Sequence, residues 1–159
     1  MITLKEYMTQ VGVTKPKYVQ QWIDLDLIPG ITRGDSLKDT LFPESARRPY
    51  CERWLNPGLH ADRIRAHIVK ACLQRRHITN RTFFISEGEF NGYIRELEEA
   101  ELIRTREEDG IVYYDSTTKS NPYREKGVEE IRKFIIDVME TIARGFTRGA
   151  TEAIIERYG

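Results

Sequence analysis

The side chains best suited to binding chemistry lie close together, near the start of the chain. They combine positive charge, a phenol and two carboxamides, and they are Lys15, Lys17, Tyr18, Gln20 and Gln21. A glutamine can form two hydrogen bonds with an adenine edge, and a lysine can approach guanine. On a helix these residues would lie on or near one open face. The pattern therefore predicts a surface that contacts the bases of a duplex.

Two short helices are expected to position this surface. Residues 3–10 would form the first and residues 14–24 the second, with a tight turn at residues 11–13. Gly12 can take the positive φ that the turn needs, and Thr14 can cap the second helix. Apolar residues at helical spacing would form a shared core: Leu4, Tyr7, Met8, Val11, Val13, Val19, Trp22 and Ile23. This is a helix-turn-helix, whose second helix is suited to a DNA major groove.

At these residues the chain resembles the MerR-type and excisionase-type winged helix-turn-helix families. Those families share a short helix, a Gly-Val-Ser/Thr turn, a second helix and a Gly-Leu-(Ile/Leu)-Pro exit into a hairpin wing. Residues 12–14 (Gly-Val-Thr) match the turn and residues 27–30 (Leu-Ile-Pro-Gly) resemble the exit, although Leu-Asp at 25–26 replaces the usual glycine. The resemblance covers roughly residues 2–50 and implies a DNA-binding unit.

A hairpin wing is expected after the second helix. Residues 34–36 (Gly-Asp-Ser) separate residues 31–33 from residues 40–42, as turn residues separate two strands. Arg33 and Lys38 would lie on this ribbon, which would be placed beside the sugar-phosphate backbone or in the minor groove. Further along, Arg47, Arg48 and Tyr50 suit phosphate and sugar contacts. The resemblance also gives Arg48 and Tyr50 this role, because backbone contacts in MerR-type chains come from the equivalent stretch.

Charge is unevenly distributed along the 159 residues, although the formal net charge is zero. Residues 1–80 hold 13 Lys or Arg against 8 Asp or Glu, whereas residues 81–159 hold 12 against 17. A polyanion would be attracted by the first half and repelled by the second, as an oriented nucleic-acid binder requires. The alternative is a solvated basic surface whose charges have acidic partners within the same chain.

A second unit is predicted beyond the Trp-Leu-Asn-Pro-Gly stretch at 54–58, which marks an internal boundary. A helix would cover residues 61–76, and Ser86 with Glu89 would form the capping box of another. Residues 102–104 and 111–114 then predict a hairpin. The expected organisation is a DNA-binding unit at 1–56, a second winged-helix-like unit at 57–120 and a C-terminal helical unit at 121–159.

The second helix of this unit is strongly acidic. It carries one arginine, Arg95, and six glutamates: Glu87, Glu89, Glu96, Glu98, Glu99 and Glu101. Phosphates would repel such a surface. We therefore expect the second unit to pack against the rest of the chain or to bind a protein partner through the acidic C-terminal half.

The last predicted helix runs from Val128 to about Tyr158. Its apolar residues alternate in steps of three and four, as in a coiled coil, and they are Val128, Ile131, Ile135, Val138 and Ile142. The pattern predicts homodimerisation, which suits a helix-turn-helix protein on a two-fold site. The alternative is that this helix folds back over its own second unit.

Catalytic and metal-binding patterns are not evident. His60, His67, His77, Cys51 and Cys72 match no ligand spacing such as Cys-x-x-Cys or His-Glu-x-x-His. The two cysteines cannot build a disulfide framework, and no apolar run is long enough to span a membrane. We therefore expect a cytoplasmic protein with no cofactor, no metal and no enzymatic activity.

The fold class predicted from these patterns is mainly α with small β-hairpins (α+β). The expected function is sequence-specific binding of double-stranded DNA, by a transcriptional regulator or an accessory factor of a mobile element. The alternative function is a protein-interaction module in which the helix-turn-helix is only structural. Binding that weakens steeply with salt would distinguish the first from the second.

Overall fold

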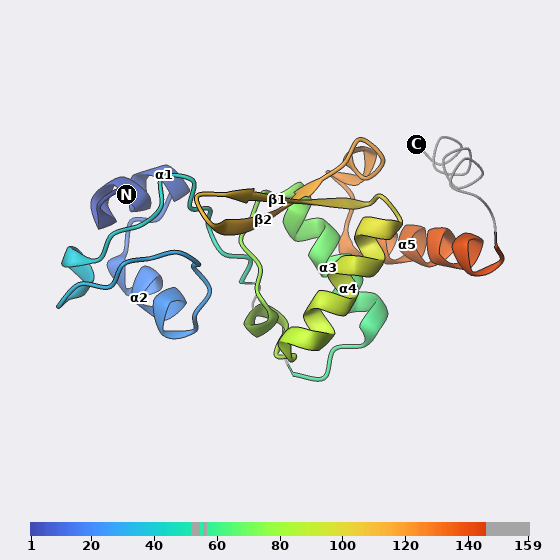
Figure 1. The fold of residues 1–159 in the computed structure, drawn as a ribbon, viewed down its shortest axis with the longest axis horizontal. Helices are drawn as coiled ribbons and strands as arrows, with labels where there is room; N and C mark the ends of the chain where they lie inside the picture. The colour runs from blue at the N-terminus through green and yellow to red at the C-terminus, as the bar shows by residue number, and fades with distance from the viewer. Residues whose placement is uncertain (52–54, 56, 146–159) are drawn as a thin grey trace.

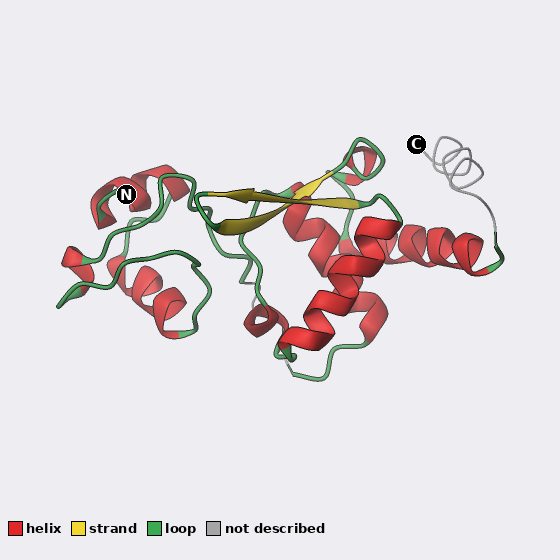
Figure 2. Ribbon diagram, in the orientation of Figure 1, coloured by secondary structure: helices red, strands yellow, loops and turns green. Residues whose placement is uncertain are grey.

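The structure is a computed structural model that describes residues 1–51, 55 and 57–145. Within these ranges the chain has five α-helices and one two-stranded antiparallel hairpin, so the predicted α+β class is confirmed (Figures 1 and 2). The elements are α1 (Leu4–Val11), α2 (Pro16–Asp24), α3 (Ala61–Leu73), α4 (Glu87–Glu99), β1 (Ile103–Glu108), β2 (Ile111–Ser116) and α5 (Val128–Ala143), with short 3-10 helices at Leu37–Asp39, Asn80–Phe83 and Asn121–Tyr123. None of the described helices is both long and apolar enough to cross a membrane.

The predicted helix-turn-helix is present as α1 and α2. Thr3 and Glu6 form a capping box at the start of α1, and Gly12 ends it in the left-handed region at φ 73°. The predicted cap at Thr14 is wrong, because α2 begins with Pro16 and Lys15 occupies the capping position without a side-chain hydrogen bond. Proline favours the first position of a helix, since it has no N–H to satisfy there and its φ is already helical.

The predicted core of this region is confirmed. Tyr7, Val13, Val19, Trp22 and Ile23 are buried, and the other three predicted residues pack around them half-buried. The ring of Tyr7 stacks on Phe42 at 4.4 Å between centroids. Burial of these apolar and aromatic side chains holds α2 against α1 and leaves the opposite side of α2 in solvent.

The predicted wing between residues 31 and 42 is wrong in its secondary structure. Only one pair of residues, Thr32 and Leu41, is bridged, by two backbone hydrogen bonds of 2.9 Å. Leu37–Asp39 form a 3-10 helix between them, and Phe42 pairs with Ile2 at the start of the chain. The segment is therefore a loop closed by the Thr32–Leu41 pair. It is not a two-stranded wing, because residues 37–39 are helical and Phe42 pairs with Ile2.

The second predicted unit has the element order of a winged helix. In it α3, the Asn80–Phe83 helix and α4 are followed by the β1–β2 hairpin. The Ser86 side chain accepts a hydrogen bond from the Glu89 backbone N–H at 3.1 Å and so caps α4. Asp109 and Gly110 join the strands with φ of 54° and 79°, the backbone that a tight two-residue hairpin turn requires.

Two separate sets of buried residues form the cores. The first set ends at Ala46, whereas Tyr50 already belongs to the second set, with α3, α4, β1 and α5. The predicted boundary at residues 54–58 falls largely outside the described residues. The division of the buried side chains therefore occurs within the described segment that precedes it.

Most of the predicted dimerisation seam of α5 is buried within its own chain. Ile131, Ile135 and Val138 are at most 2% exposed, because α5 folds back and packs against α3. Val128 is half-buried against the same core, whereas Ile142 is 40% exposed. The apolar stripe thus stabilises its own chain, as the alternative interpretation expected. The predicted part of this helix beyond Gly145 lies outside the described residues.

Candidate nucleic-acid interface

The outer face of α2 carries most of the predicted base-contacting residues. Lys15, Lys17, Tyr18 and Gln21 are exposed, with 43% of Tyr18 accessible. The ammonium of Lys17 lies 5.4 Å from the Tyr18 ring centroid. Neither lysine forms an ion pair with a carboxylate of the described residues. Gln20 differs from this group, because it is half-buried and donates to Asp24 at 2.8 Å.

Arg33 lies where the closed loop meets the end of α2. Its guanidinium donates a hydrogen bond of 3.2 Å to the carbonyl oxygen of Ile23. A cation near the last carbonyls of a helix is favourable, because those oxygens carry the negative end of the helix dipole. The side chain remains exposed, so it can still face a phosphate beside α2.

Arg48 adjoins the flank of α2. Its guanidinium carbon lies 5.7 Å from the Trp22 ring, at the margin of a cation–π contact. Trp22 is one helical turn from Tyr18 and is largely buried, so Arg48 lies at the edge of the core beside α2. The side chain is half-buried and has no carboxylate partner among the described residues. This position fits the predicted phosphate contact.

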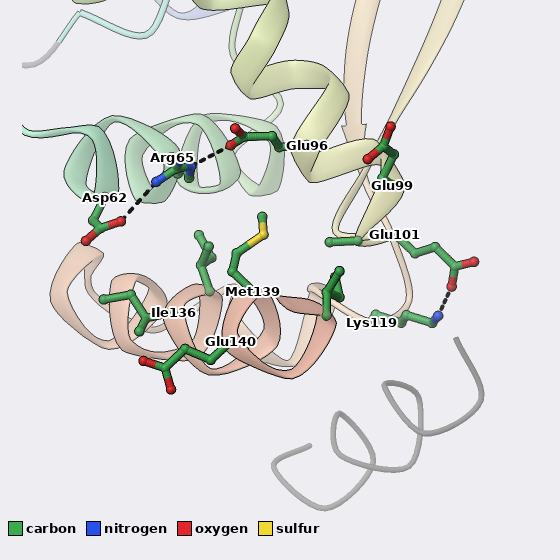
Figure 3. Close-up of a pocket in the computed structure, with 12 residues that line it drawn as sticks. Asp62, Arg65, Glu96, Glu99, Glu101, Lys119, Ile136, Met139 and Glu140 are labelled. Atoms are coloured by element: carbon green, nitrogen blue, oxygen red, sulfur yellow. Dashed lines mark hydrogen bonds and ion pairs between the residues drawn. The ribbon is translucent and has the colours of Figure 1, made fainter. Parts of the chain in front are cut away.

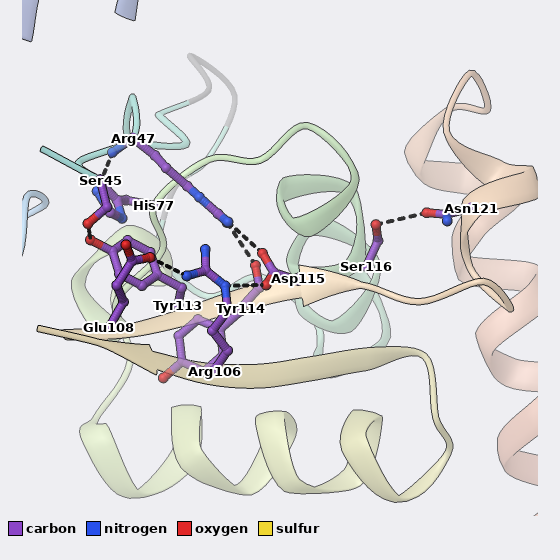
Figure 4. A network of polar contacts seen from close by, with 10 residues as sticks. All are labelled: Ser45, Arg47, His77, Arg106, Glu108, Tyr113, Tyr114, Asp115, Ser116 and Asn121. Carbon is purple, nitrogen blue, oxygen red and sulfur yellow. Dashed lines mark hydrogen bonds and ion pairs between the residues drawn. The ribbon is translucent and has the colours of Figure 1, made fainter. Parts of the chain in front are cut away.

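Arg47 does not have the predicted surface role. Its side chain is 9% exposed, pairs with Asp115 at 2.5 Å and donates to the Tyr114 carbonyl at 3.1 Å (Figure 4). Asp115 also accepts a hydrogen bond of 2.8 Å from Arg106. Burial would raise the pKa of Asp115, but the hydrogen bonds from the two arginines hold this pKa below its usual value. Arg47 thus fixes the chain internally and is not available to a phosphate.

Tyr50 is also an internal residue, contrary to the prediction. It is 1% exposed, and its hydroxyl is hydrogen-bonded to Nδ1 of His67 at 2.7 Å. Burial lowers the pKa of His67 to about 4. His77 accepts the Arg47 backbone N–H at 2.6 Å, and burial together with the charge of Arg47 lowers its pKa to about 3. Both imidazoles are therefore neutral parts of the core.

Several basic residues of α3 have partners within the chain. Arg65 pairs with Asp62 at 3.0 Å and with Glu96 at 2.7 Å. The ammonium of Lys70 donates to the backbone carbonyls of Arg124 and Lys126. Arg65 therefore has acidic partners within the chain, as the alternative interpretation of the basic first half expects, whereas Lys70 is bound by carbonyl oxygens.

A basic surface that the sequence reasoning missed lies beside the β1–β2 hairpin. A cleft of about 540 Å³ is lined by the end of α1, by residues 45–48, by the end of α3 and by β1. A smaller cleft of about 310 Å³ shares Arg75 and Arg106 with it and adds Arg104 and Arg124. The alternation of Arg104 and Arg106 on β1 was the available signal, because residues two apart on a strand face the same side.

The opposite charge gathers between α3, α4 and α5. A groove of about 560 Å³ there has an apolar floor that includes Met139 and a rim that includes Glu96, Glu99 and Glu140 (Figure 3). Phosphates would be repelled from this rim. This groove therefore does not suit a nucleic acid.

The likeness of this chain to known proteins is distant. No family model matches the sequence, and no curated protein matches it. The zinc-dependent MarR family transcriptional regulator AdcR, solved in its Zn(II)-bound state, is 16% identical over 65% of this chain and 74% of its own, with a TM-score of 0.36. A single-residue mutant of Lactococcus lactis ZitR is 15% identical over 99% of this chain and 94% of its own, with a TM-score of 0.37. These TM-scores are too low for either likeness to define a shared fold.

Proposed function

We propose that the protein is a sequence-specific DNA-binding regulator whose α2 helix enters a major groove. The observation that carries this proposal is the outer face of α2, where Lys17, Tyr18 and Gln21 are exposed while the opposite side is fixed in a core. A rigid helix with free donors and an aromatic ring is suited to contact base edges. Lysines without acidic partners retain their attraction for phosphate.

The residues divide into two roles on this proposal. Lys17 and Gln21 are one helical turn apart and contact bases. Lys15, Arg33 and Arg48 surround them and bind the sugar-phosphate backbone, which sets the register of the helix without reading sequence. Gln20, held by Asp24, supports the flank of the helix.

The class of regulator is part of the same proposal. The similarity of residues 2–50 to MerR-type and excisionase-type chains supports a transcriptional regulator or a mobile-element accessory factor. A homodimer on a two-fold site would multiply a modest affinity. Contacts between the two copies would then lie outside the buried stripe of α5.

Selection of random duplexes on the purified protein tests the proposal. We expect enrichment of a defined motif and an affinity that falls steeply with salt. The variant Lys17→Ala/Gln21→Ala should lose about tenfold or more of its preference for that motif, since each good base contact contributes roughly 1–3 kcal/mol. Lys133→Ala, an exposed change on α5, is the matched control. No enrichment and no binding at low salt would contradict the proposal.

A further inference from the structure

Four arginines form a continuous basic surface across both parts of the chain, which we name the arginine face. Its members are Arg48, Arg75, Arg104 and Arg124. Arg48 and Arg75 line the larger cleft, and Arg75, Arg104 and Arg124 line the smaller one. Arg75 therefore joins the two clefts.

The charges of the arginine face are not neutralised by neighbouring acids. In these clefts the carboxylates of Asp115 and Glu108 are engaged by Arg47 and Arg106, which pair at 2.5–2.8 Å (Figure 4). None of the four arginines has a carboxylate oxygen within 4.0 Å among the described residues. Both acids are therefore paired with Arg47 and Arg106, whereas the side chains of Arg75, Arg104 and Arg124 are exposed and keep their positive charge in solvent.

The backbone presents these side chains on one side of the hairpin. Arg104 and Arg106 are two residues apart on β1, opposite Asp115 and Tyr113 of β2, so all four side chains share a face. Arg75 follows α3 in the left-handed region at φ 56°, where its N–H still bonds the carbonyl oxygen of Cys72 at 3.1 Å. Cys72 and Arg75 line the smaller cleft together with Arg104 and Arg106 of β1.

The arginine face begins next to the proposed base-reading helix. Val11, the last residue of α1, lines the larger cleft and precedes the Gly12 turn that leads into α2. Arg48 contacts the flank of α2 through Trp22. A surface that starts at the helix-turn-helix and continues over two open clefts matches an extended polyanion better than a single small anion.

We propose that the arginine face binds the phosphate backbone of the duplex whose groove α2 enters, so that DNA contacts both parts of the chain. This inference rests on the proposed function. Guanidinium groups suit the task because their planar donors pair with phosphate oxygens in a bidentate manner. The contact adds affinity for every sequence alike, because phosphates carry no base identity.

The test compares two triple variants of the full chain. Arg75→Gln/Arg104→Gln/Arg124→Gln removes three charges from the arginine face. Arg95→Gln/Lys133→Gln/Arg144→Gln removes three charges from α4, from α5 and from the residue that caps α5. Affinity for the selected duplex and for an unrelated duplex is measured as salt is varied. Thermal melts confirm that both variants fold, which we expect because the substituted side chains are exposed.

The arginine-face variant should lose about tenfold or more in affinity for both duplexes, with a salt slope smaller by roughly 2–3, since each neutralised phosphate contributes about 0.9. The control variant should keep the parent slope. An unchanged slope, or an equal loss in the control, would overturn the inference. If DNA binding depends on Lys17 and Gln21 but not on the arginine face, only this inference fails. If the parent binds no duplex, the proposed function itself fails.

Discussion

Arg47 and Asp115 are 68 residues apart in the sequence, and their side chains form an ion pair of 2.5 Å that fastens the segment after the helix-turn-helix to strand β2. The side chains are 9% and 19% exposed, so the pair is largely removed from water. The hydroxyls of Ser45 and Tyr113 are hydrogen-bonded nearby. This joint, the Arg47–Asp115 ion pair, connects the segment that follows the helix-turn-helix to the hairpin that carries Arg104 and Arg106.

Removal of one partner of this joint should be costly. Asp115→Ala would leave Arg47 with an uncompensated buried charge, and we expect the free energy of unfolding to fall by about 3 kcal/mol. Urea unfolding measures this loss. Glu107→Ala, an exposed change on the same hairpin, should alter stability by less than about 0.5 kcal/mol. Equal effects of the two substitutions would show that the joint does not stabilise the fold.

The two buried histidines predict a loss of stability in mild acid. The pKa of His67 is lowered to about 4 and that of His77 to about 3, mainly by burial. Below pH 6.5 the unfolded chain binds a proton on each imidazole that the folded chain does not bind. The free energy of unfolding should therefore decrease from pH 6.5 to 4, by up to about 1.4 kcal/mol per pH unit for each histidine.

His77→Gln separates this effect from the titration of carboxylates. Glutamine keeps an acceptor for the Arg47 backbone N–H but cannot be protonated, so the pH dependence between 6.5 and 4 should fall by roughly half. Because the pKa of Asp115 is depressed, its own contribution is lost only at more acidic pH. Unfolding curves at several pH values provide the measurement. A variant with the full parental slope would exclude His77 as a cause.

Gly12 should tolerate no side chain without a cost in backbone energy. Its φ is 73°, and an added Cβ would meet nothing within 4 Å, so strain in the left-handed region is the main penalty. Gly12→Ala should lower the free energy of unfolding by about 1 kcal/mol. Gly92→Ala in α4 is the matched control, since that position also has open space but lies within a helix. There alanine should be stabilising by up to about 1 kcal/mol, and the same sign at both positions would contradict this explanation.

The parts of the fold that were predicted correctly depend on residues close together in the sequence. Gly12, the Ser86 cap and the turn before β2 each satisfy a local backbone requirement, so their residue types indicate where elements begin and end. The cap of α2 was predicted at Thr14, one residue before the observed capping position, Lys15. Both residues precede Pro16, and their types alone do not show at which residue the helix begins. The wing was mispredicted because Phe42 pairs with Ile2, a distant partner.

The parts that could not be predicted depend on contacts between distant segments. The sequence of Arg47, Arg48 and Tyr50 is the same whether an arginine contacts DNA or a buried carboxylate. The ion pair with Asp115, which is distant in sequence, determines the internal role of Arg47. The spacing of apolar residues in α5 shows that one side of the helix is apolar, but it does not show which part of the molecule covers that side. Arg75, Arg104 and Arg124 are far apart in sequence, so only the fold brings them to one surface.

The apolar stripe of α5 leads to the last prediction, which separates folding from association. Ile135 is 2% exposed and lies in the core between α3 and α5, so Ile135→Ala should cost about 3 kcal/mol of unfolding free energy. Ile142 belongs to the same heptad pattern but is 40% exposed, and Ile142→Ala should cost much less. If the stripe serves the fold of its own chain, sedimentation of both variants under native conditions should give the parental oligomeric state. Dissociation of a parental dimer by Ile135→Ala at a temperature where the chain remains folded would instead restore the coiled-coil interpretation of α5.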